Sequence, residues 1–325
     1  MIKVGFIGFG KFAQVRLKYI KEHKSVKVVG AFDPYQVEFH GHKNFANVEQ
    51  LLAECDAVFI SVPPSLAPHY TEQALAKNKH VFCEKPAAIS VNALKNIPLV
   101  KSVDTVLAYG FNHRQHESVE EMMRVIQSGY LGSILWMRGR YGKEVDDNYR
   151  DDWRCDFKLN GGGILIDQGI HMVDLMSYLA NGFDGAQAVL SNNTLNIKNI
   201  EDNGFITLYS SETKISASVH TTITQWRYLF SLEVYLEHGS LILNGLRTNS
   251  GKYGDEILTI KPNSRAAKQI EEQEFKYNTN NSWQREVNEF ISSIRENRSY
   301  KFATLKDANR TTQLIELVYD NAIWI

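Results

Sequence analysis

A glycine-rich turn near the start of the chain constrains the fold more than any other feature. Residues 2–8 form the short apolar run that a buried parallel strand needs, and residues 11–23 carry apolar side chains at helical spacing. Between them, Gly8, Gly10 and Ala13 make a G-x-G-x-x-A pattern. Gly8 permits a tight turn, Gly10 lets the backbone approach a pyrophosphate, and Ala13 allows close helix–strand packing. The pattern predicts a dinucleotide-binding strand–turn–helix; the alternative is an ordinary turn of another parallel sheet.

A second apolar run, residues 26–32, ends at Asp33, which follows Ala13 by 20 residues. At this distance, dinucleotide-binding folds place an acid that accepts hydrogen bonds from ribose hydroxyls. A carboxylate here repels a 2′-phosphate, and the next residue is Pro34 instead of an arginine that could pair with one. The sequence therefore favours NAD over NADP, with Lys43 as the one nearby feature that argues the other way.

Alternating strand and helix patterns continue to about residue 111. Asn47 can cap a helix that ends at Glu54, and Ser90 can cap a helix over residues 91–103. Strand patterns cover residues 57–62, 80–83 and 105–111, and another helix pattern covers residues 69–77. Repeated units of this length predict a doubly wound parallel sheet, in which ligands lie at the carboxyl ends of the strands.

One of those strand ends carries Glu84-Lys85-Pro86. A lysine at a strand tip that faces a nicotinamide can exchange a proton with a substrate hydroxyl or orient it, because burial and the cationic ring both favour its neutral form. The alternative is an exposed loop lysine.

Residues 161–174 read GGGILIDQGIHMVD. In a helix, Asp167 and His171 would share one face, one turn apart. A carboxylate that orients a histidine suits proton transfer near neutral pH, whereas the alternative is a surface ion pair. The glycines at the start let the backbone approach another group closely, and we expect that group to be the substrate or the nicotinamide.

Together these motifs resemble the Gfo/Idh/MocA family (glucose–fructose oxidoreductase, inositol dehydrogenase and rhizopine catabolism proteins). The resemblance rests on the glycine turn, Glu84-Lys85-Pro86, Asn112-His113-Arg114, Trp153-Arg154, residues 161–174 and two closing helices at 283–295 and 304–321. It implies a Rossmann domain joined to an α+β domain with a large, open, mostly antiparallel sheet. It also implies NAD or NADP as cofactor and hydride transfer at a carbon of a sugar, cyclitol or sugar derivative.

The resemblance places the family's catalytic residues on Lys85, Asp167 and His171. His171 would be the general base in oxidation, Asp167 would orient it, and Lys85 would stabilise the charge that develops on the substrate oxygen. We expect the substrate to contact Lys85, Tyr109, Arg114, Tyr141, Trp153, Asp167 and His171. We expect the cofactor to contact Gly8, Phe9, Gly10, Lys11, Phe12, Asp33, Pro34, Ser61, Val62, Pro63, His69, Glu84, Lys85, Asn112, Trp153 and Arg154.

Two domains are expected in a chain of 325 residues. Residues 1–115 would form the Rossmann domain, and residues 116–325 the α+β domain that binds substrate and drives oligomerisation. In the second domain we expect a helix capped by Ser118 and ending near Ser128, an irregular loop over residues 141–158 and a helix over residues 167–179. Strand patterns cover residues 133–142, 204–209, 214–224, 228–237, 240–244 and 257–261. One sheet face would be covered by a helix and the other by another subunit, which gives a homodimer or homotetramer.

Composition limits the partners and the location. With 36 basic and 37 acidic residues, the net charge of −1 produces no field that would attract nucleic acid or an anionic membrane. No apolar run approaches about 20 residues and no export signal is apparent, so we predict a soluble cytoplasmic protein. Three widely spaced cysteines fit a reducing compartment. We predict no metal site, because His113 and His116 lack a carboxylate or cysteine that completes a ligand set, and we expect one or both of them at the surface.

The predicted function is an NAD-dependent dehydrogenase that acts on CH–OH groups of a small sugar or polyol. Two alternatives stay open: a redox-neutral enzyme, such as a glycosidase or an epimerase-like enzyme, that uses tightly held NAD, and a non-catalytic NAD(H)-binding sensor. Intact Lys85, Asp167 and His171 argue against the sensor. Neutral and charged substrates are both candidates, because Arg154 could bind a carboxylate or phosphate or pair with Asp151 or Asp152.

Overall fold

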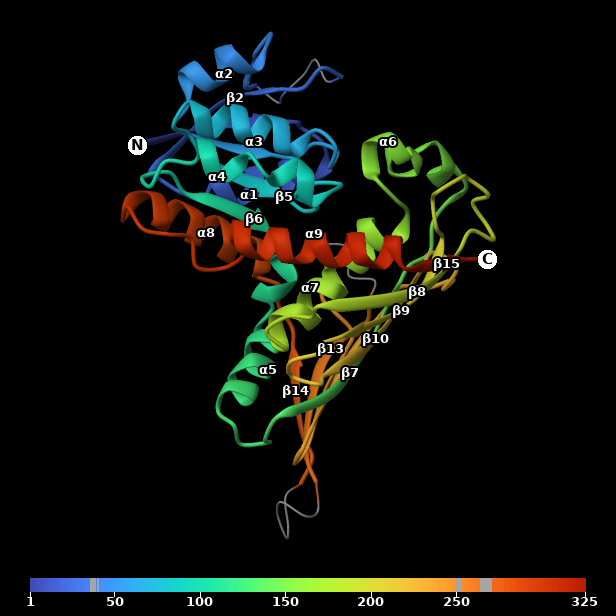
Figure 1. The fold of residues 1–325 in the computed structure, drawn as a ribbon. Coiled ribbons are helices and arrows are strands. Elements are labelled where there is room, and N and C mark those ends of the chain that lie inside the picture. The colour runs from blue at the N-terminus through green and yellow to red at the C-terminus, as the bar shows by residue number, and fades with distance from the viewer. Residues whose placement is uncertain (36–38, 40, 249–252, 264–270) are drawn as a thin grey trace. The chain divides into compact units, whose positions relative to one another are not determined.

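The chain forms two compact units in the computed structural model, which describes residues 1–35, 39, 41–248, 253–263 and 271–325 (Figure 1). Unit 1 comprises Met1–Asn112 and Ser282–Thr312, and unit 2 comprises His113–Asn281 and Gln313–Ile325. The first division lies three residues before the one proposed from the sequence, between residues 112 and 113. The larger difference is that residues 282–312 belong to the first unit.

Unit 1 is built on a six-stranded parallel sheet with the order β3-β2-β1-β4-β5-β6. The predicted doubly wound sheet is therefore confirmed. Because β1 lies between β2 and β4, the strand order reverses at the carboxyl end of β1, where ligands bind in sheets of this kind. The strands are β1 (Ile2–Ile7), β2 (Val26–Phe32), β3 (Lys43–Asn44), β4 (Ala57–Ile60), β5 (His80–Glu84) and β6 (Leu107–Gly110).

The helices of unit 1 follow the predicted caps, with one correction. The side chain of Asn47 accepts a hydrogen bond from the amide of Gln50 at 2.9 Å, and that of Ser90 accepts one from Ala93 at 3.3 Å. The continuous helix predicted over residues 91–103 is wrong: Pro98 lacks an amide donor, and the chain forms only two short turns there. The elements are α1 (Lys11–Ile20), α2 (Val48–Glu54), α3 (Ala67–Ala76), η1 (Val91–Leu94) and α4 (Ile97–Val100), with α8 (Ser282–Arg295) and the first part of α9 (Leu305–Asp320).

Helix α8 belongs to unit 1 because its apolar face completes the core of the parallel sheet. The ring of Phe290 meets Phe59 and Phe82 edge-on, with centroid distances of 5.3 Å and 5.6 Å. Phe59 and Phe82 stack on each other at 5.1 Å. Removing this helix would expose a row of aromatic side chains on β4 and β5.

Unit 2 is built on a nine-stranded sheet with the order β14-β13-β12-β11-β7-β10-β9-β8-β15. Among the strand pairs in the described part of this unit, β7–β10 and β8–β15 are parallel and the others antiparallel, so the predicted large, mostly antiparallel sheet is confirmed. Strands β8, β14 and β15 were not predicted. The strands are β7 (Ile134–Gly142), β8 (Gly185–Ser191), β9 (Asn203–Tyr209), β10 (Ser216–Thr222), β11 (Leu229–Leu236), β12 (Gly239–Asn244), β13 (Glu256–Pro262), β14 (Gln273–Tyr277) and β15 (Ala322–Trp324).

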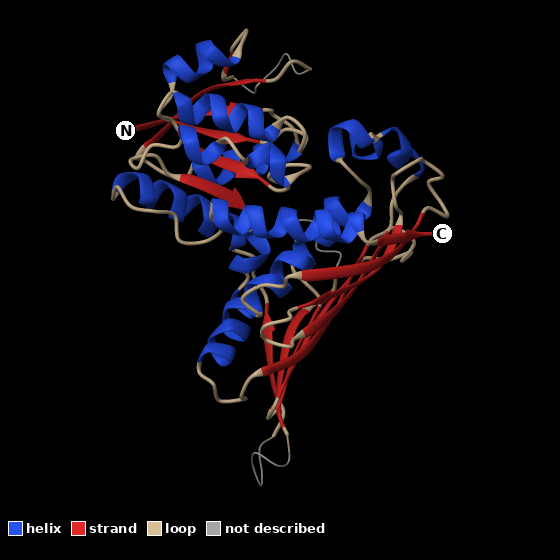
Figure 2. Cartoon of the chain, in the orientation of Figure 1, coloured by secondary structure: helices blue, strands red, loops and turns tan. Residues whose placement is uncertain are grey.

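Two helices pack on this sheet, α5 (Glu117–Gln127) on β13 and β14, and α7 (Ile170–Leu179) on β7 and β10 (Figure 2). Ser118 does not cap α5 as predicted, since its hydroxyl donates to Glu256 at 2.5 Å and His116 holds the cap position. The helix ends near Ser128 as predicted, and Gly129, with a φ of +69°, follows directly. Among the helices of the described ranges, none combines the length and the apolar character that a bilayer span requires.

The loop predicted as irregular over residues 141–158 contains three short helical turns. They are η3 (Asp147–Asp151), η4 (Trp153–Cys155) and α6 (Phe157–Asn160). The side chain of Asp152 accepts a hydrogen bond from the amide of Arg154 at 3.0 Å, and that of Asp156 accepts one from Lys158 at 2.8 Å. Asp152 and Asp156 therefore cap two short turns that were not predicted from the sequence.

Replacing Gly8 by alanine is expected to destabilise unit 1. Gly8 has a φ of +77°, and a Cβ there would lie 2.4 Å from the carbonyl oxygen of Ser61. The matched control is Gly10→Ala, because a Cβ at Gly10 meets no heavy atom within 4 Å. Urea unfolding should show a loss of about 2 kcal/mol or more for G8A and a change below about 1 kcal/mol for G10A. Equal losses would contradict this description of the turn.

Candidate functional site

The carboxylate of Asp33 lies against the glycine turn. The amide of Phe9 donates to Asp33 Oδ2 at 2.7 Å, and the amide of Tyr35 donates to Oδ1 at 2.9 Å. Helix α1 begins directly after Gly10, beside which there is open space. An acid at the end of β2, a helix N-terminus and an open glycine are the parts that a ribose and a pyrophosphate require. The residues present thus fit a dinucleotide.

The remaining predicted cofactor contacts are divided between the units. In unit 1, Pro34, Lys11, Phe12 and His69 are exposed, and Ser61, Val62 and Pro63, which follow β4, are half-buried. Phe12 stacks on Trp283 at a centroid distance of 5.9 Å, and Asn112 donates to the hydroxyl of Ser282 at 3.1 Å. Trp153 and Arg154 belong to unit 2. Their contacts with a cofactor remain predictions.

Glu84, next to Lys85 in the chain, is held by a buried ion pair that was not predicted from the sequence. Arg16 is fully buried; its Nε donates to Glu84 Oε1 at 2.7 Å, and its Nη2 lies 2.7 Å from Glu286 Oε2. The guanidinium carbon lies 4.3 Å from the ring centroids of both Phe82 and Trp283. Because Lys85 directly follows Glu84, this cluster fixes the strand end from which the candidate catalytic lysine projects.

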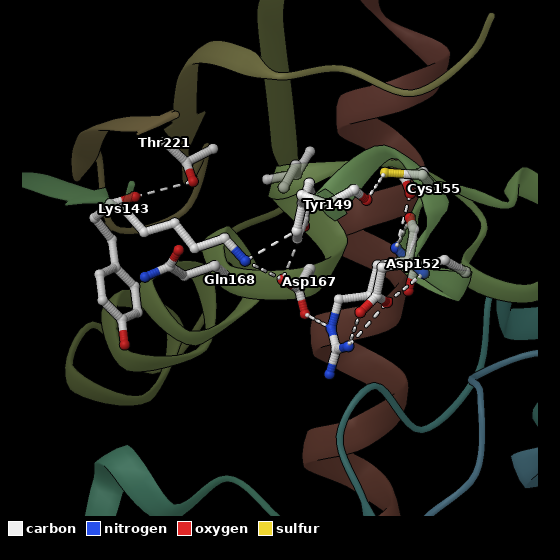
Figure 3. A network of polar contacts seen from close by, with 12 residues as sticks. Lys143, Tyr149, Asp152, Cys155, Asp167, Gln168 and Thr221 are labelled. Atoms are coloured by element: carbon white, nitrogen blue, oxygen red, sulfur yellow. Dashed lines mark hydrogen bonds and ion pairs between the residues drawn. The ribbon is translucent and has the colours of Figure 1, made fainter. Parts of the chain in front are cut away.

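Asp167 lies in a π turn, η5 (Leu165–Gly169), that runs into α7. The continuous α-helix predicted over residues 167–179 is therefore a π turn followed by an α-helix. Its carboxylate accepts hydrogen bonds from Lys143 Nζ at 2.8 Å and Arg154 Nε at 3.1 Å (Figure 3). Arg154 also contacts Asp152 at 3.0 Å, one of the two aspartates suggested as its partner. Two cations thus hold the Asp167 carboxylate in place. Its predicted role in orienting His171 stays a prediction.

Charges around Asp167 affect the neighbouring titratable groups. Burial lowers the pKa of Arg154, but the carboxylates of Asp167 and Asp152 outweigh this effect and raise the pKa above its ordinary value. Burial, followed by the charge of Asp167, raises the pKa of the Tyr149 hydroxyl well above its ordinary value. Burial also raises the pKa of the Cys155 thiol to about 11, so this cysteine stays protonated near neutral pH.

His171 lies on α7 and is 7% exposed. Its ring stacks on that of His113, with centroids 3.8 Å apart and an interplanar angle of 19°. His113 Nε2 lies 2.9 Å from the hydroxyl oxygen of Tyr141. The expectation that one or both of His113 and His116 lie at the surface is wrong: both are buried, and His116 Nδ1 lies 3.0 Å from Glu256 Oε2. These inward partners explain their burial, since a buried imidazole needs hydrogen bonds.

The predicted substrate contacts have very different surroundings. Arg114 makes a buried bidentate ion pair with Asp174, with distances of 2.8 Å and 2.6 Å. Tyr109 and Tyr141 are buried, whereas 36% of Trp153 is exposed and its ring lies 4.5 Å from the guanidinium carbon of Arg154. Of these side chains, Trp153 offers an accessible flat surface to a ligand. The predicted substrate contacts of all four remain predictions.

The glycines before Asp167 have an internal role instead of the expected approach to a ligand. A Cβ at Gly162 would lie 2.0 Å from the hydroxyl oxygen of Tyr319, and one at Gly163 would lie 2.0 Å from the carbonyl oxygen of Glu201. The buried Glu201 carboxylate accepts hydrogen bonds from the amides of Gly163 and Leu165, each at 2.8 Å, and from Tyr319 at 3.0 Å. Glu201 thereby supplies the cap that the start of η5 lacks locally.

Within the described ranges, no group of three or more histidine, cysteine or acidic side chains is arranged to hold a metal ion. The three cysteines are buried and free.

Comparison with known proteins agrees with this architecture. Residues 2–111 match a family model described as "Oxidoreductase family, NAD-binding Rossmann fold", and residues 119–242 match one described as "GFO/IDH/MocA C-terminal domain". The chain belongs to the Gfo/Idh/MocA family. The resemblance seen in the sequence is thereby confirmed for the Rossmann part and for the C-terminal part of the chain.

Curated and solved relatives support the assignment. The chain is 30% identical to the glucose-6-phosphate 3-dehydrogenase of Bacillus subtilis over 214 residues, which cover 62% of this chain and 60% of that protein. A levoglucosan dehydrogenase solved with NADH has a TM-score of 0.82 at 18% identity and covers 98% of this chain and 96% of its own. A 3-ketoreductase from Actinomadura kijaniata, solved with NADP and TDP-benzene, has a TM-score of 0.83 at 18% identity, with coverages of 100% and 98%. These two structures show the shared fold.

Replacing Glu201 by glutamine is expected to change how stability depends on pH. Burial raises the pKa of the Glu201 carboxyl from 4.5 to about 7, although hydrogen bonds from Leu165, Gly163 and Tyr319 lower it. The folded state thus holds the proton more tightly than the unfolded chain, so this stabilisation is complete below about pH 4.5 and is lost as the pH rises to about 7. Unfolding measured across this window should show wild-type stability falling relative to E201Q. A difference that does not vary with pH would contradict the prediction.

Proposed function

We propose that this Gfo/Idh/MocA protein is an NAD-dependent dehydrogenase that oxidises or reduces a carbinol carbon of a sugar, cyclitol or sugar derivative. The observation that carries the proposal is the hydrogen bond from the amide of Phe9, in the glycine turn, to the carboxylate of Asp33. Both residues lie in the part of the chain that matches the family's NAD-binding Rossmann model. The named relatives, dehydrogenases of glucose 6-phosphate and of levoglucosan, support a sugar substrate.

The preference for NAD over NADP rests on the same carboxylate. Both oxygens of Asp33 already accept backbone hydrogen bonds, which fix the negative charge at the end of β2. A 2′-phosphate placed there would meet this charge, and Pro34 offers no cation to pair with it. Ribose hydroxyls, in contrast, can donate hydrogen bonds to a carboxylate.

The proposed mechanism divides the work among three side chains. When bound, the nicotinamide accepts or supplies the hydride. His171 accepts the hydroxyl proton of the substrate in oxidation and returns it in reduction. Lys85 donates a hydrogen bond to the same oxygen and stabilises its developing negative charge. Asp167, held by Lys143 and Arg154, contributes a fixed negative charge that favours the protonated state of His171.

We further propose that the uncovered face of the unit 2 sheet binds a second copy of the chain. Apolar, aromatic and polar residues from β7, β8, β9, β10 and β15 line a hollow of about 750 Å³ on this face. They include Val189, Phe205, Tyr209 and Ile323, of which Phe205 is 56% exposed and stacks on His220. Exposed apolar clusters of this kind commonly mark contacts between protein subunits.

Turnover should require both Lys85 and His171. With NAD and NADP each offered against inositols, aldoses, sugar phosphates and sugar nucleotides, absorbance should report reduced cofactor, with NAD the better acceptor. Lys85→Met and His171→Asn should lower turnover by about 10²–10⁴-fold, because each removes a proton-transfer or charge-stabilising group. NADH binding, followed by fluorescence, should persist in both variants.

His238→Asn, at an exposed hairpin position, is the matched control and should keep wild-type turnover. Unchanged turnover in both K85M and H171N would refute the assignment of these roles. Bound NAD that is never released as NADH during conversion of a sugar would point instead to redox-neutral chemistry.

Sedimentation should show a homodimer or homotetramer at working concentration. Phe205→Lys places a charge on the proposed contact face and should shift the protein toward monomer. Tyr130→Lys is the control, because Tyr130 is equally exposed, at 56%, but lies in the turn before β7. A wild-type monomer, or equal effects of the two variants, would remove the proposed interface.

A further inference from the structure

The stacked imidazoles of His113 and His171 are a buried pair drawn from two different elements of unit 2. His113 comes from η2 (Asn112–Gln115) and His171 from α7, and their exposed fractions are 5% and 7%. The rings are nearly parallel, with centroids 3.8 Å apart. This distance is within van der Waals contact, so neither ring can rotate without moving the other.

We propose that His113 is a positioning residue that holds the ring plane of His171 and remains neutral while His171 carries the transferred proton. The inference rests on the proposed function, in which His171 is the base. The inference concerns His113, for which the sequence predicted no role in catalysis. Its buried contact with His171 indicates one.

Tyr141 gives a physical reason for the neutrality of His113. Its hydroxyl oxygen lies 2.9 Å from His113 Nε2, and burial raises the pKa of this hydroxyl well above its ordinary value, so the proton stays on the oxygen. The same oxygen also interacts with Gln168 and Tyr253. In the tautomer that we assign, the Tyr141 hydroxyl donates to Nε2, and a proton at Nε2 would break that hydrogen bond.

The stack itself opposes a second proton. Two imidazolium rings in face-to-face contact repel each other, so protonation of one lowers the proton affinity of the other. A neutral ring, in contrast, presents an electron-rich face to an imidazolium and stabilises it. The pair is therefore expected to bind one proton near neutral pH, and the contact with Tyr141 directs that proton to His171.

The charged groups on the surrounding elements occur in pairs. Next to His113 in the chain, Arg114 pairs with Asp174 of α7. Asp167 of η5 pairs with Lys143, which follows β7, and with Arg154 of η4. His116, whose ring centroid lies 5.7 Å from that of His113, pairs with Glu256 of β13. Within this set of charges, the His113 ring is an uncharged neighbour in face-to-face contact with His171, and we expect it to affect how strongly His171 binds its proton.

The test is the titration of His171 in the intact protein, followed by NMR of labelled histidine without substrate, with His171→Asn used to assign the signal. His113→Leu removes the aromatic face, and we expect the His171 pKa to fall by about 0.5 unit. His113→Phe keeps a ring in the stack, and the shift should be clearly smaller. The acidic limb of the kcat/KM profile should move with the His171 pKa, while the KM for NAD stays unchanged.

The three proteins should first be shown to be folded by near-ultraviolet circular dichroism. Equal His171 pKa values in wild type, H113L and H113F would then overturn the proposal, because they would mean that His113 only fills space beside His171. Should H113L fail to fold, the variant Tyr141→Phe tests the same proposal. It removes the hydroxyl but keeps the ring, so His113 can compete for the proton; the His171 pKa should fall, and an unchanged value would overturn the proposal.

Failure of the proposed function gives a different result. If H171N keeps full turnover, the assignment of the base is wrong, whatever the titration shows. If H171N loses turnover but the His171 pKa ignores His113 and Tyr141, only the positioning role is wrong.

Discussion

The buried carboxylate of Glu201 anchors the segment on which the proposed chemistry of unit 2 depends. It accepts hydrogen bonds from the backbone of Gly163 and Leu165 and from the hydroxyl of Tyr319. Helix starts leave amide groups unpaired, and the local residue at this start provides no side-chain cap. One distant side chain therefore fixes where η5 begins, and the start of η5 determines the directions in which Asp167 and His171 project.

Charge pairing keeps these directions fixed. Lys143 and Arg154 hold Asp167, and Arg114 and Asp174 form a bidentate pair one helical turn beyond His171. In unit 1, the buried Arg16 holds Glu84 beside Lys85 in the same manner. Groups that are already oriented by such contacts need little rearrangement when a substrate develops charge, which is how preorganised sites favour a transition state.

Features that depend on neighbouring residues could be read from the sequence. The turn at Gly8, the cap by Asn47 and the alternation of strands and helices involve contacts within one or two elements, and the structure reproduces them. Arg16 also left a local signal, because it lies on the same helical face as the buried Ala13 and Ile20, where a charge requires a partner.

Long-range partners could not be read in this way. Nothing near Glu201 in the sequence identifies Gly163 as its donor, and the spacing of His113 and His116 suggested surface residues or metal ligands. Their burial depends on Tyr141, His171 and Glu256, which follow 28 or more residues later. The helix predicted over residues 91–103 failed for the opposite reason: a local restriction at Pro98 ended what the cap at Ser90 had begun.

Hydride transfer from a carbinol carbon is the event that defines the proposed enzyme, and isotope transfer tests it most directly. The sugar that the protein oxidises fastest would be prepared with deuterium at the carbon to be oxidised and incubated with NAD and the wild-type protein. Mass spectrometry of the released cofactor should show NADH that carries the deuterium. Deuterium retained in the sugar or lost to water, without deuterated NADH, would contradict a net dehydrogenase.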